Sequence, residues 1–426
     1  MGGLLIWKLI IYLRNLKNIN KIFLYLLFFL LPVDYLSLTA QYLREFGSRP
    51  ASIVLLLLFI YTLLSYKLAR KISNYLPVIF FIIYVSISYI FYRILFYDDN
   101  IYYQKNSIFQ FISHTLLFGL AITLVSGLRY NNKIFLFKPY YPIIFAATIH
   151  LFTFFLDYLD LTKDIINQAL LHNFRMWGQV NEKSSGFMAE ASTYGVFGVI
   201  YSALTFEVGR YFFGFRKIII YILSAVILST TIIIQAKTGL IVLLIIWIVL
   251  YSKKRVSLLA LPVIGLIAFY YIDKHAMFDL NNNLSSAMRI GSTMVALNAF
   301  IETNWLIGIG PGQFHFEYLL SRFPEFLFSS QEAIAQSSPD TFYRASTYSL
   351  LFRLLLEIGI VGTIISIYSV YRIYIRKPIG IAEQNNRLFK IIFLGSLAFL
   401  LSQDTYFYPM FIFSLSGILA TSIKKI

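Results

Sequence analysis

Residues 347–367 read TYSLLFRLLLEIGIVGTIISI, and this stretch decides the fold class because it has the composition of a membrane span. A helix of about 20 mainly apolar residues crosses the hydrocarbon core of a bilayer. The two charges in the stretch, Arg353 and Glu357, stand four residues apart and therefore share one face of a helix. Charges within a membrane mark either a function or a mutual pair. A structural pair is the simpler of these two interpretations.

Similar apolar runs recur along the whole chain, which has 426 residues, of which 58% are hydrophobic and 13% charged. A soluble domain carries about 25% charged residues. We therefore predict an all-α, polytopic integral membrane protein, with about twelve transmembrane helices in a single transmembrane domain over residues 1–426. The expected spans are Ile22–Leu38, Ile53–Tyr66, Leu76–Phe96, Ile108–Leu128, Pro142–Leu156, Ala191–Phe206, Ile218–Ile234, Gly239–Leu250, Val256–Tyr271, Thr347–Ile367, Leu388–Leu401 and Met410–Ile423. The run 218–250 is divided at QAKTG (235–239) because one helix of about 33 residues would overshoot the bilayer.

The lysines and arginines set the orientation of these spans. With both termini in the cytoplasm, the internal segments and adjoining span ends hold 23 of the 36 basic residues but only two of the 20 acids. Cytoplasmic loops carry such an excess of basic residues. The net charge of +16 is thus explained by topology, and nucleic-acid binding is not expected. The chain has no cysteine, which excludes disulfides and thiolate chemistry, and we expect no cleavable signal peptide.

Two external loops are long, over residues 157–190 and 273–346, and we expect them to carry short helices and the function. The second contains NWLIGIGPGQFHF (304–316), with three glycines and a proline. A nucleotide-binding interpretation fails because the external side offers no ATP or NAD and no strand precedes the glycines. We expect the glycines to form a tight turn against the membrane, where φ > 0 or close backbone approach is needed. A phosphate held by the backbone N–H groups of this turn is the second possibility.

Arginines near the external membrane surface are the candidates for binding an anion, since their planar fork of donors suits phosphate. We single out Arg175, Arg289 and Arg344. The positions around Arg289 suit an amphipathic helix lying along the membrane surface. Arg322 and Lys237 are more simply explained as ordinary surface cations that pair with acids or reach lipid headgroups.

Two residues are candidates for a general base. His315 follows the glycine turn, and histidine titrates near neutrality. Glu190 lies at the external mouth of the sixth span, although it would also suit a helix N-terminus there. His172 is a further histidine in the first large loop, while His114 and His150 fall within spans and are expected to pack there. The histidines and acids show no metal-ligand spacing, so we expect no metal and no cofactor.

Together these segments resemble the Wzy-type O-antigen polymerases and the related O-antigen ligases. The resemblance rests on NWLIGIGPGQF (304–314), on LLLEIGIVG (354–362), and on Arg175 standing eleven residues before Gly186. The ligases carry a His-Asn pair nine residues before the glutamate of the second motif. Tyr348 and Ser349 occupy that place in this chain, which favours the polymerase and leaves its base unassigned.

The resemblance implies that the substrates are undecaprenyl-diphosphate-linked oligosaccharides on the periplasmic face of the bacterial inner membrane. Arg175, Arg289 and Arg344 would then neutralise the diphosphate, and Glu190 or His315 would accept a proton. Membrane lipid, a chain-length regulator and a flippase are the implied partners.

Three alternatives stay open at this stage. A ligase would deliver the same donor to lipid A core. A lipid-linked oligosaccharide flippase also has about twelve spans, but such transporters are usually built from two similar halves. A non-enzymatic membrane scaffold would not need arginines in two long external loops.

Overall fold

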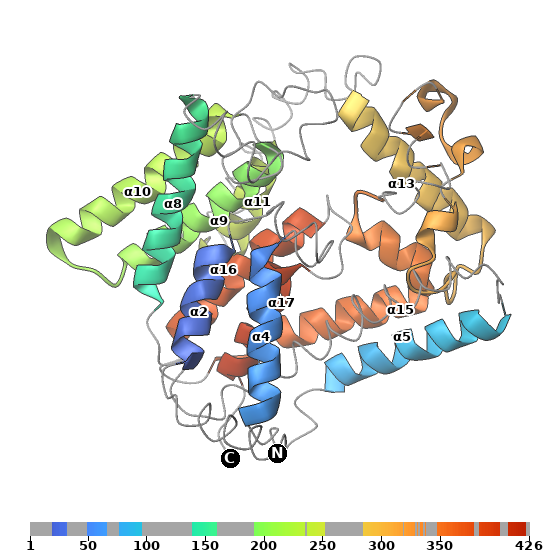
Figure 1. Cartoon of the computed structure of the whole chain (residues 1–426), viewed down its shortest axis with the longest axis horizontal. Coiled ribbons are helices and arrows are strands. Elements are labelled where there is room, and N and C mark those ends of the chain that lie inside the picture. The colour runs from blue at the N-terminus through green and yellow to red at the C-terminus, as the bar shows by residue number, and fades with distance from the viewer. Residues whose placement is uncertain are drawn as a thin grey trace, which may run out of the picture.

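The computed structural model is entirely helical over the residues that it describes (Figure 1). These are residues 19–31, 49–65, 76–95, 139–159, 191–234, 237–251, 284–317, 319–328, 330, 333–334, 337, 347–378, 383–400 and 408–422. Within these ranges there is no strand, so the predicted all-α class is confirmed.

The helices follow one another with short 3-10 turns between α13 and α15. In chain order the elements are α2 (Ile19–Leu30), α4 (Pro50–Ser65), α5 (Leu76–Leu95), α8 (Tyr140–Tyr158), α9 (Ala191–Gly209), α10 (Gly214–Ile233), α11 (Lys237–Ile246), the π-helical turn η7 (Trp247–Tyr251), α13 (Leu284–Glu302), η8 (Phe314–Glu317), η9 (Leu320–Arg322), η10 (Glu325–Leu327), α15 (Leu350–Tyr374), α16 (Glu383–Leu400) and α17 (Pro409–Ser422).

A helix occupies ten of the predicted spans, and the other two, 108–128 and 256–271, lie outside the described residues. The division of the run 218–250 is confirmed, because α10 ends at Ile233 and α11 begins at Lys237. Among the described helices, α10 and α15 are long and apolar enough to cross a membrane. The total of twelve spans stays a prediction.

The main core forms where α9 packs against α8, α10, α11 and α16, and where α16 packs against α17. Small residues at the contacts let these helices pack closely, and hydrogen bonds between helices stabilise the packing. Gly395 of α16 touches Ile200 of α9 so closely that an added Cβ would lie 2.3 Å from the Ile200 side chain. The buried Tyr201 hydroxyl donates to the carbonyl oxygen of Phe28 in α2 at 2.8 Å. Small residues at contacts and interhelical hydrogen bonds are typical of helices packed within a membrane.

A cluster of charged side chains links α9 to α16, at the end of α9 that we predict to be internal. The carboxylate of Glu207 is buried and pairs with Arg387 of α16 at 3.1 Å and with Arg210 at 3.3 Å. The hydroxyl of Tyr211 also donates to Glu207, at 3.3 Å. Burial, followed by the charge of Glu207, raises the pKa of Tyr211 to about 12, so the phenol stays a donor at physiological pH. This cluster ties α9 to α16 at one edge of the core.

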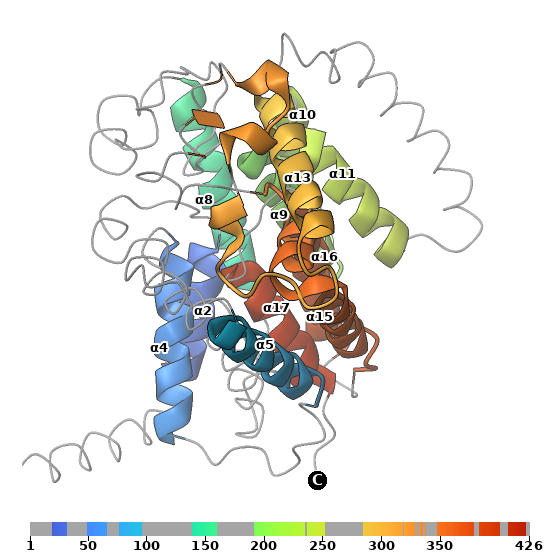
Figure 2. The ribbon, with the colours of Figure 1, turned by 90° about the vertical axis from the view of Figure 1, so that its right-hand side faces the viewer.

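The long loop over 273–346 carries its own small core beside α15 (Figure 2). One face of α13 buries Met288, Val295 and Ala299 against the 3-10 turns and Leu356 of α15. The short helices expected in this loop are thus present in its described part, and α13 is the helix expected around Arg289. On its other face α13 exposes an apolar strip at i, i+3 and i+7, namely Met294, Leu297 and Ile301. That strip keeps α13 suited to the membrane surface, which stays a prediction.

Candidate functional site

Helix α15 is interrupted at Gly359, whose backbone has φ 66° and ψ −177°. In an unbroken helix the N–H of residue i bonds to the carbonyl of residue i−4. The interruption therefore leaves the carbonyls of Leu356 and Glu357 without their helical donors, and the N–H groups of Ile360 and Val361 without their acceptors. We call this position the helix break. Four backbone polar groups at one point of an apolar helix require partners from elsewhere.

Residues 304–313, which we call the glycine loop, supply all four partners. The carbonyl of Leu356 accepts from the N–H of Ile309 at 3.0 Å, and that of Glu357 accepts from Gly310 at 2.9 Å. In the opposite direction, Ile360 donates to the carbonyl of Trp305 at 2.9 Å. Val361 likewise donates to the carbonyl of Leu306, at 3.3 Å. The glycine loop thus replaces two lost helical bonds by four bonds of its own.

The glycines are needed because two backbones meet at this point. A Cβ on Gly308 would lie 2.5 Å from the carbonyl carbon of Glu357, and one on Gly359 would lie 2.3 Å from the carbonyl oxygen of Leu306. Gly308, Gly310 and Gly312 also have φ of 76°, 100° and 78°, which other L-residues rarely adopt. The tight turn expected from the sequence is confirmed. A phosphate cradle is disfavoured, since the N–H groups of Gly308, Ile309 and Gly310 already donate within the protein.

The two charges within α15 pair with each other in the half that precedes the helix break. The Nε of Arg353 lies 3.2 Å from Oε1 of Glu357, and both side chains are buried. The guanidinium also lies over the ring of Phe314, 4.2 Å from its centroid. A cation over an aromatic face is favourable within about 6 Å. The structural pair inferred from their spacing is present, and it joins α15 to the first residue of η8.

Arg289 and Tyr348 meet where α13 passes the N-terminus of α15. The guanidinium of Arg289 lies 5.5 Å from the centroid of the Tyr348 ring, and both residues are partly buried. Tyr348 has φ 51°, which makes it a non-glycine residue with a left-handed backbone. Such a conformation costs about 1–2 kcal/mol and persists where surrounding contacts impose it. One such contact is the hydroxyl of Thr293 in α13, which donates to the carbonyl of Thr347 at 3.4 Å.

The remaining candidate residues have different places. Arg322 pairs with Glu302 at 3.2 Å and with Glu317, as expected of a cation that pairs with acids. His315 lies within η8, next to Phe314 and two residues after the end of the glycine loop. Arg175, Glu190 and Arg344 lie outside the described residues. Of the predicted site residues, the structure therefore describes Arg289, in α13, and His315, in η8.

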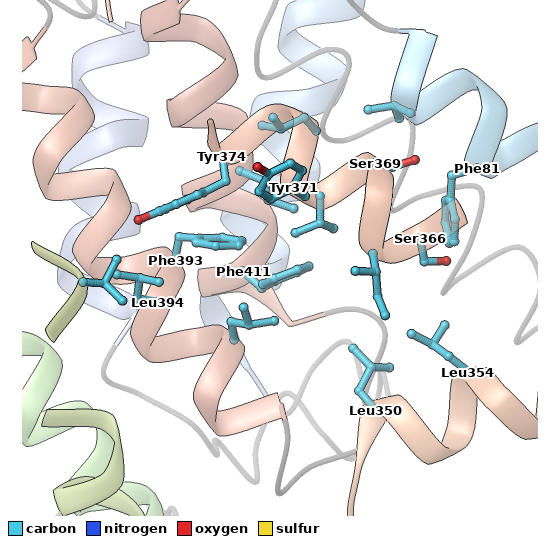
Figure 3. A pocket seen from close by; sticks show the side chains of 17 residues that line it. Phe81, Leu350, Leu354, Ser366, Ser369, Tyr371, Tyr374, Phe393, Leu394 and Phe411 are labelled. Atoms are coloured by element: carbon cyan, nitrogen blue, oxygen red, sulfur yellow. The ribbon is translucent and has the colours of Figure 1, made fainter. Parts of the chain in front are cut away.

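A mainly apolar cavity, which we call the apolar cavity, lies along α15 (Figure 3). It has a volume of about 420 Å³. Leu350 and Leu354 line it before the helix break, and Ser366 through Tyr374 contribute after the break, so the bent helix wraps around it. Further walls come from Phe81 of α5, Phe393 of α16 and Phe411 of α17. Leu350, which lines this cavity, stands two residues after Tyr348.

Buried polar groups also occur away from this region. The ring of His150 in α8 stacks on Tyr194 with centroids 4.1 Å apart, and among the described residues its Nε2 has no hydrogen-bond partner. The expectation that His150 packs within the core is confirmed. No described residue gives it an opening toward the glycine loop or the apolar cavity, and we assign it no role in the site.

Sequence reasoning missed two aromatic partners and the cavity. In the sequence, Tyr348 is a departure from the ligase pattern and Phe314 is part of a motif. Neither pattern indicates that an arginine lies over the ring. Tyr348 stands two residues before the start of α15 at Leu350. An aromatic residue at that place carries no signal of a left-handed backbone. The cavity depends on four helices from distant parts of the chain, so no local pattern reveals it.

A comparison with protein families finds a match over the same part of the chain. Residues 218–367 match the family model described as O-antigen ligase. The match begins in α10, includes α13 and the glycine loop, and ends in α15 beyond the helix break. A search of curated proteins returned no match. Residues 218–367, which hold the helix break, the glycine loop and Arg289, are thus related to the O-antigen ligase family.

Proposed function

We propose that the protein is a membrane glycosyltransferase that polymerises undecaprenyl-diphosphate-linked oligosaccharide repeat units on the periplasmic face of the inner membrane. One observation carries the proposal. Arg289 lies over the ring of Tyr348, which stands two residues before Leu350, a residue that lines the apolar cavity. A cation next to an apolar cavity suits an amphiphile with an anionic head and a hydrocarbon tail. The family match supports glycan chemistry.

The reaction would proceed by displacement at the sugar carbon that carries the diphosphate. A hydroxyl of the incoming repeat unit attacks the anomeric carbon of the growing chain, and a new C–O bond forms. The bond from that carbon to the diphosphate oxygen breaks, and the diphosphate leaves with the electron pair. The hydroxyl proton passes to a base, for which Glu190 and His315 are our candidates. Because diphosphate is a weak base, cations can stabilise it without a general acid.

The arginines supply that stabilisation. Arg289 is the described member of the set, and the proposal assigns Arg175 and Arg344 to the same diphosphate. The ring of Tyr348 limits the directions in which the Arg289 side chain can turn. A side chain already held in place loses less conformational entropy when it binds a ligand. Tyr348 is therefore a positioning residue for Arg289 in this scheme. A flippase and a chain-length regulator would act before and beside this step.

A ligase that delivers the glycan to lipid A core is the second candidate, because the matching family model carries that description. The residue at the N-terminus of α15 bears on the choice. A tyrosine with a cation over its ring occupies position 348, where the ligases that the chain resembles carry histidine. This supports a polymerase, since the proposed ligase base is missing from its place.

The test is an assay of the purified protein in detergent with its lipid-linked repeat unit and EDTA. A ladder of longer lipid-linked glycans is the expected product. Transfer to added lipid A core without a ladder would mean a ligase. Formation of neither product from an authentic substrate would reopen the transporter interpretation.

Substitution of Arg289 tests the assignment of the cation. We expect Arg289→Ala to lose chain extension by about 100-fold or more, because one lost electrostatic contact to a developing charge costs that much. Arg289→Lys keeps the charge and should retain part of the activity. Gel filtration and helix content would show that both variants fold. Long-chain polymer at the wild-type level in Arg289→Ala would remove this residue from the site.

A further inference from the structure

A second groove, distinct from the apolar cavity, runs between α5 and the half of α15 that follows the helix break. Its volume is about 540 Å³. Six residues of α5, four of α15 and Arg376, two residues beyond the end of α15, line it, and none of them is acidic. The two helices touch along its floor, where the Ser369 hydroxyl donates to the carbonyl of Pro77 at 2.8 Å. Figure 1 shows α5 and α15 side by side over this length.

Charge is confined to one end of this groove. Arg372 and Arg376 line it at the C-terminal end of α15, and the guanidinium of Arg372 lies 5.8 Å from the centroid of Tyr368. The remaining length is walled by exposed apolar side chains, including Phe80, Ile83 and Ile87. The groove is therefore an amphiphile site with two cations at one end and apolar walls beyond them. We call it the arginine groove.

The length of the arginine groove matches one leaflet of a membrane. Its lining on α5 extends from Leu76 to Ile87, which is about 16 Å at the helical rise. The hydrocarbon core of a bilayer is about 30 Å thick, so each leaflet occupies about half of that. The positive charge lies at the end of α15 that the distribution of basic residues places in the cytoplasm. Basic pockets between helices on that side suit anionic lipid headgroups.

We propose that the arginine groove binds an anionic glycerophospholipid of the inner leaflet, with its phosphodiester between Arg372 and Arg376 and one acyl chain along α5. This site is separate from the external site proposed for the glycan donor. The lipid would fill the space between α5 and α15 and hold the two helices together. Its binding does not depend on whether the protein is a polymerase or a ligase.

The test is native mass spectrometry of the purified protein in detergent, titrated with phosphatidylglycerol or with phosphatidylcholine of the same acyl chains. Wild type should bind phosphatidylglycerol in preference. Arg372→Gln/Arg376→Gln should lose roughly 25-fold in apparent affinity, at about fivefold for each charge. The control is Arg216→Gln/Lys217→Gln, which removes two exposed charges near the start of α10, outside the groove. That variant should keep the wild-type preference.

A second variant and a second probe keep the result decisive. Ile83→Trp fills the apolar length and leaves both arginines, so it should also lower phosphatidylglycerol binding. Glycerol 3-phosphate, which has no acyl chain, should not compete. Equal binding by wild type, Arg372→Gln/Arg376→Gln and Ile83→Trp would overturn the proposal. Competition by glycerol 3-phosphate would reduce the site to a simple anion site, and displacement by traces of polyprenyl phosphate would assign it to another lipid.

Discussion

At the scale of single residues, the charged pair of Arg353 and Glu357 has a structural role in α15, whereas we propose a functional role for Arg289 in α13. Arg353 and Glu357 are both buried, and their pairing is completed by the ring of Phe314. Arg289 is partly buried and lies over the ring of Tyr348. Removing one partner of a buried pair leaves an uncompensated charge, whereas an accessible arginine can be lost at little cost to folding. The two kinds of arginine therefore predict opposite mutational behaviour.

A double-mutant cycle tests this for the buried pair. We expect Glu357→Met alone to destabilise the protein by about 3–5 kcal/mol, because Arg353 is left unpaired in an apolar setting. Arg353→Met/Glu357→Met should recover most of that loss, since two apolar side chains of similar volume replace the pair. Unfolding in detergent, followed by circular dichroism, measures both effects. If the double variant is stable but inactive, the pair has a catalytic role and the structural assignment is wrong.

At the scale of elements, the helix break joins two segments that are some 50 residues apart in the chain. The glycine loop and α15 form four backbone hydrogen bonds, and side chains at Gly308 or Gly359 would block that approach. Residues 304–314 and 354–362 thus form one unit that holds α13 and its arginine beside the N-terminus of α15. Disruption of the contact should affect the site without any direct change to Arg289.

Glycine substitutions test the fit between these elements. Gly359→Ala should release the glycine loop, because a Cβ would meet the Leu306 carbonyl at 2.3 Å. The matched control is Gly214→Ala. Its φ is also positive, at 59°, but the added Cβ would meet no atom outside its own stretch of chain within 4 Å. The control should lose only about 1 kcal/mol. Limited proteolysis within 304–314 should rise sharply for Gly359→Ala alone. Equal protection of the loop in the two variants would contradict the interlocked arrangement.

At the scale of the whole molecule, the proposed chemistry depends on which side of the membrane α13 occupies. The predicted orientation places α13 outside and the end of α15 inside. The absence of native cysteine makes this accessible to a direct test. Asn298 on α13 and Lys377 beyond α15 are both exposed, and both can carry a single introduced thiol.

We expect a maleimide that cannot cross membranes to label Asn298→Cys in intact spheroplasts. Lys377→Cys should react only after the membrane is opened by detergent. Full labelling of both in detergent is the control for folding and reagent. The reverse pattern would place the glycine loop in the cytoplasm, and the periplasmic reaction would have to be abandoned.

The sequence by itself determined the helical class, the position of most helices, the division between α10 and α11 and the pairing of Arg353 with Glu357. These follow from local chemistry, because apolar runs, charge spacing and breaks in hydropathy act within a few helical turns. It also indicated that the glycines form a tight turn. What the turn packs against was decided only by the tertiary structure, since the helix break exposes backbone groups that no side-chain pattern reports. The same is true of Arg289 over Tyr348, the apolar cavity and the arginine groove, which arise where distant helices meet.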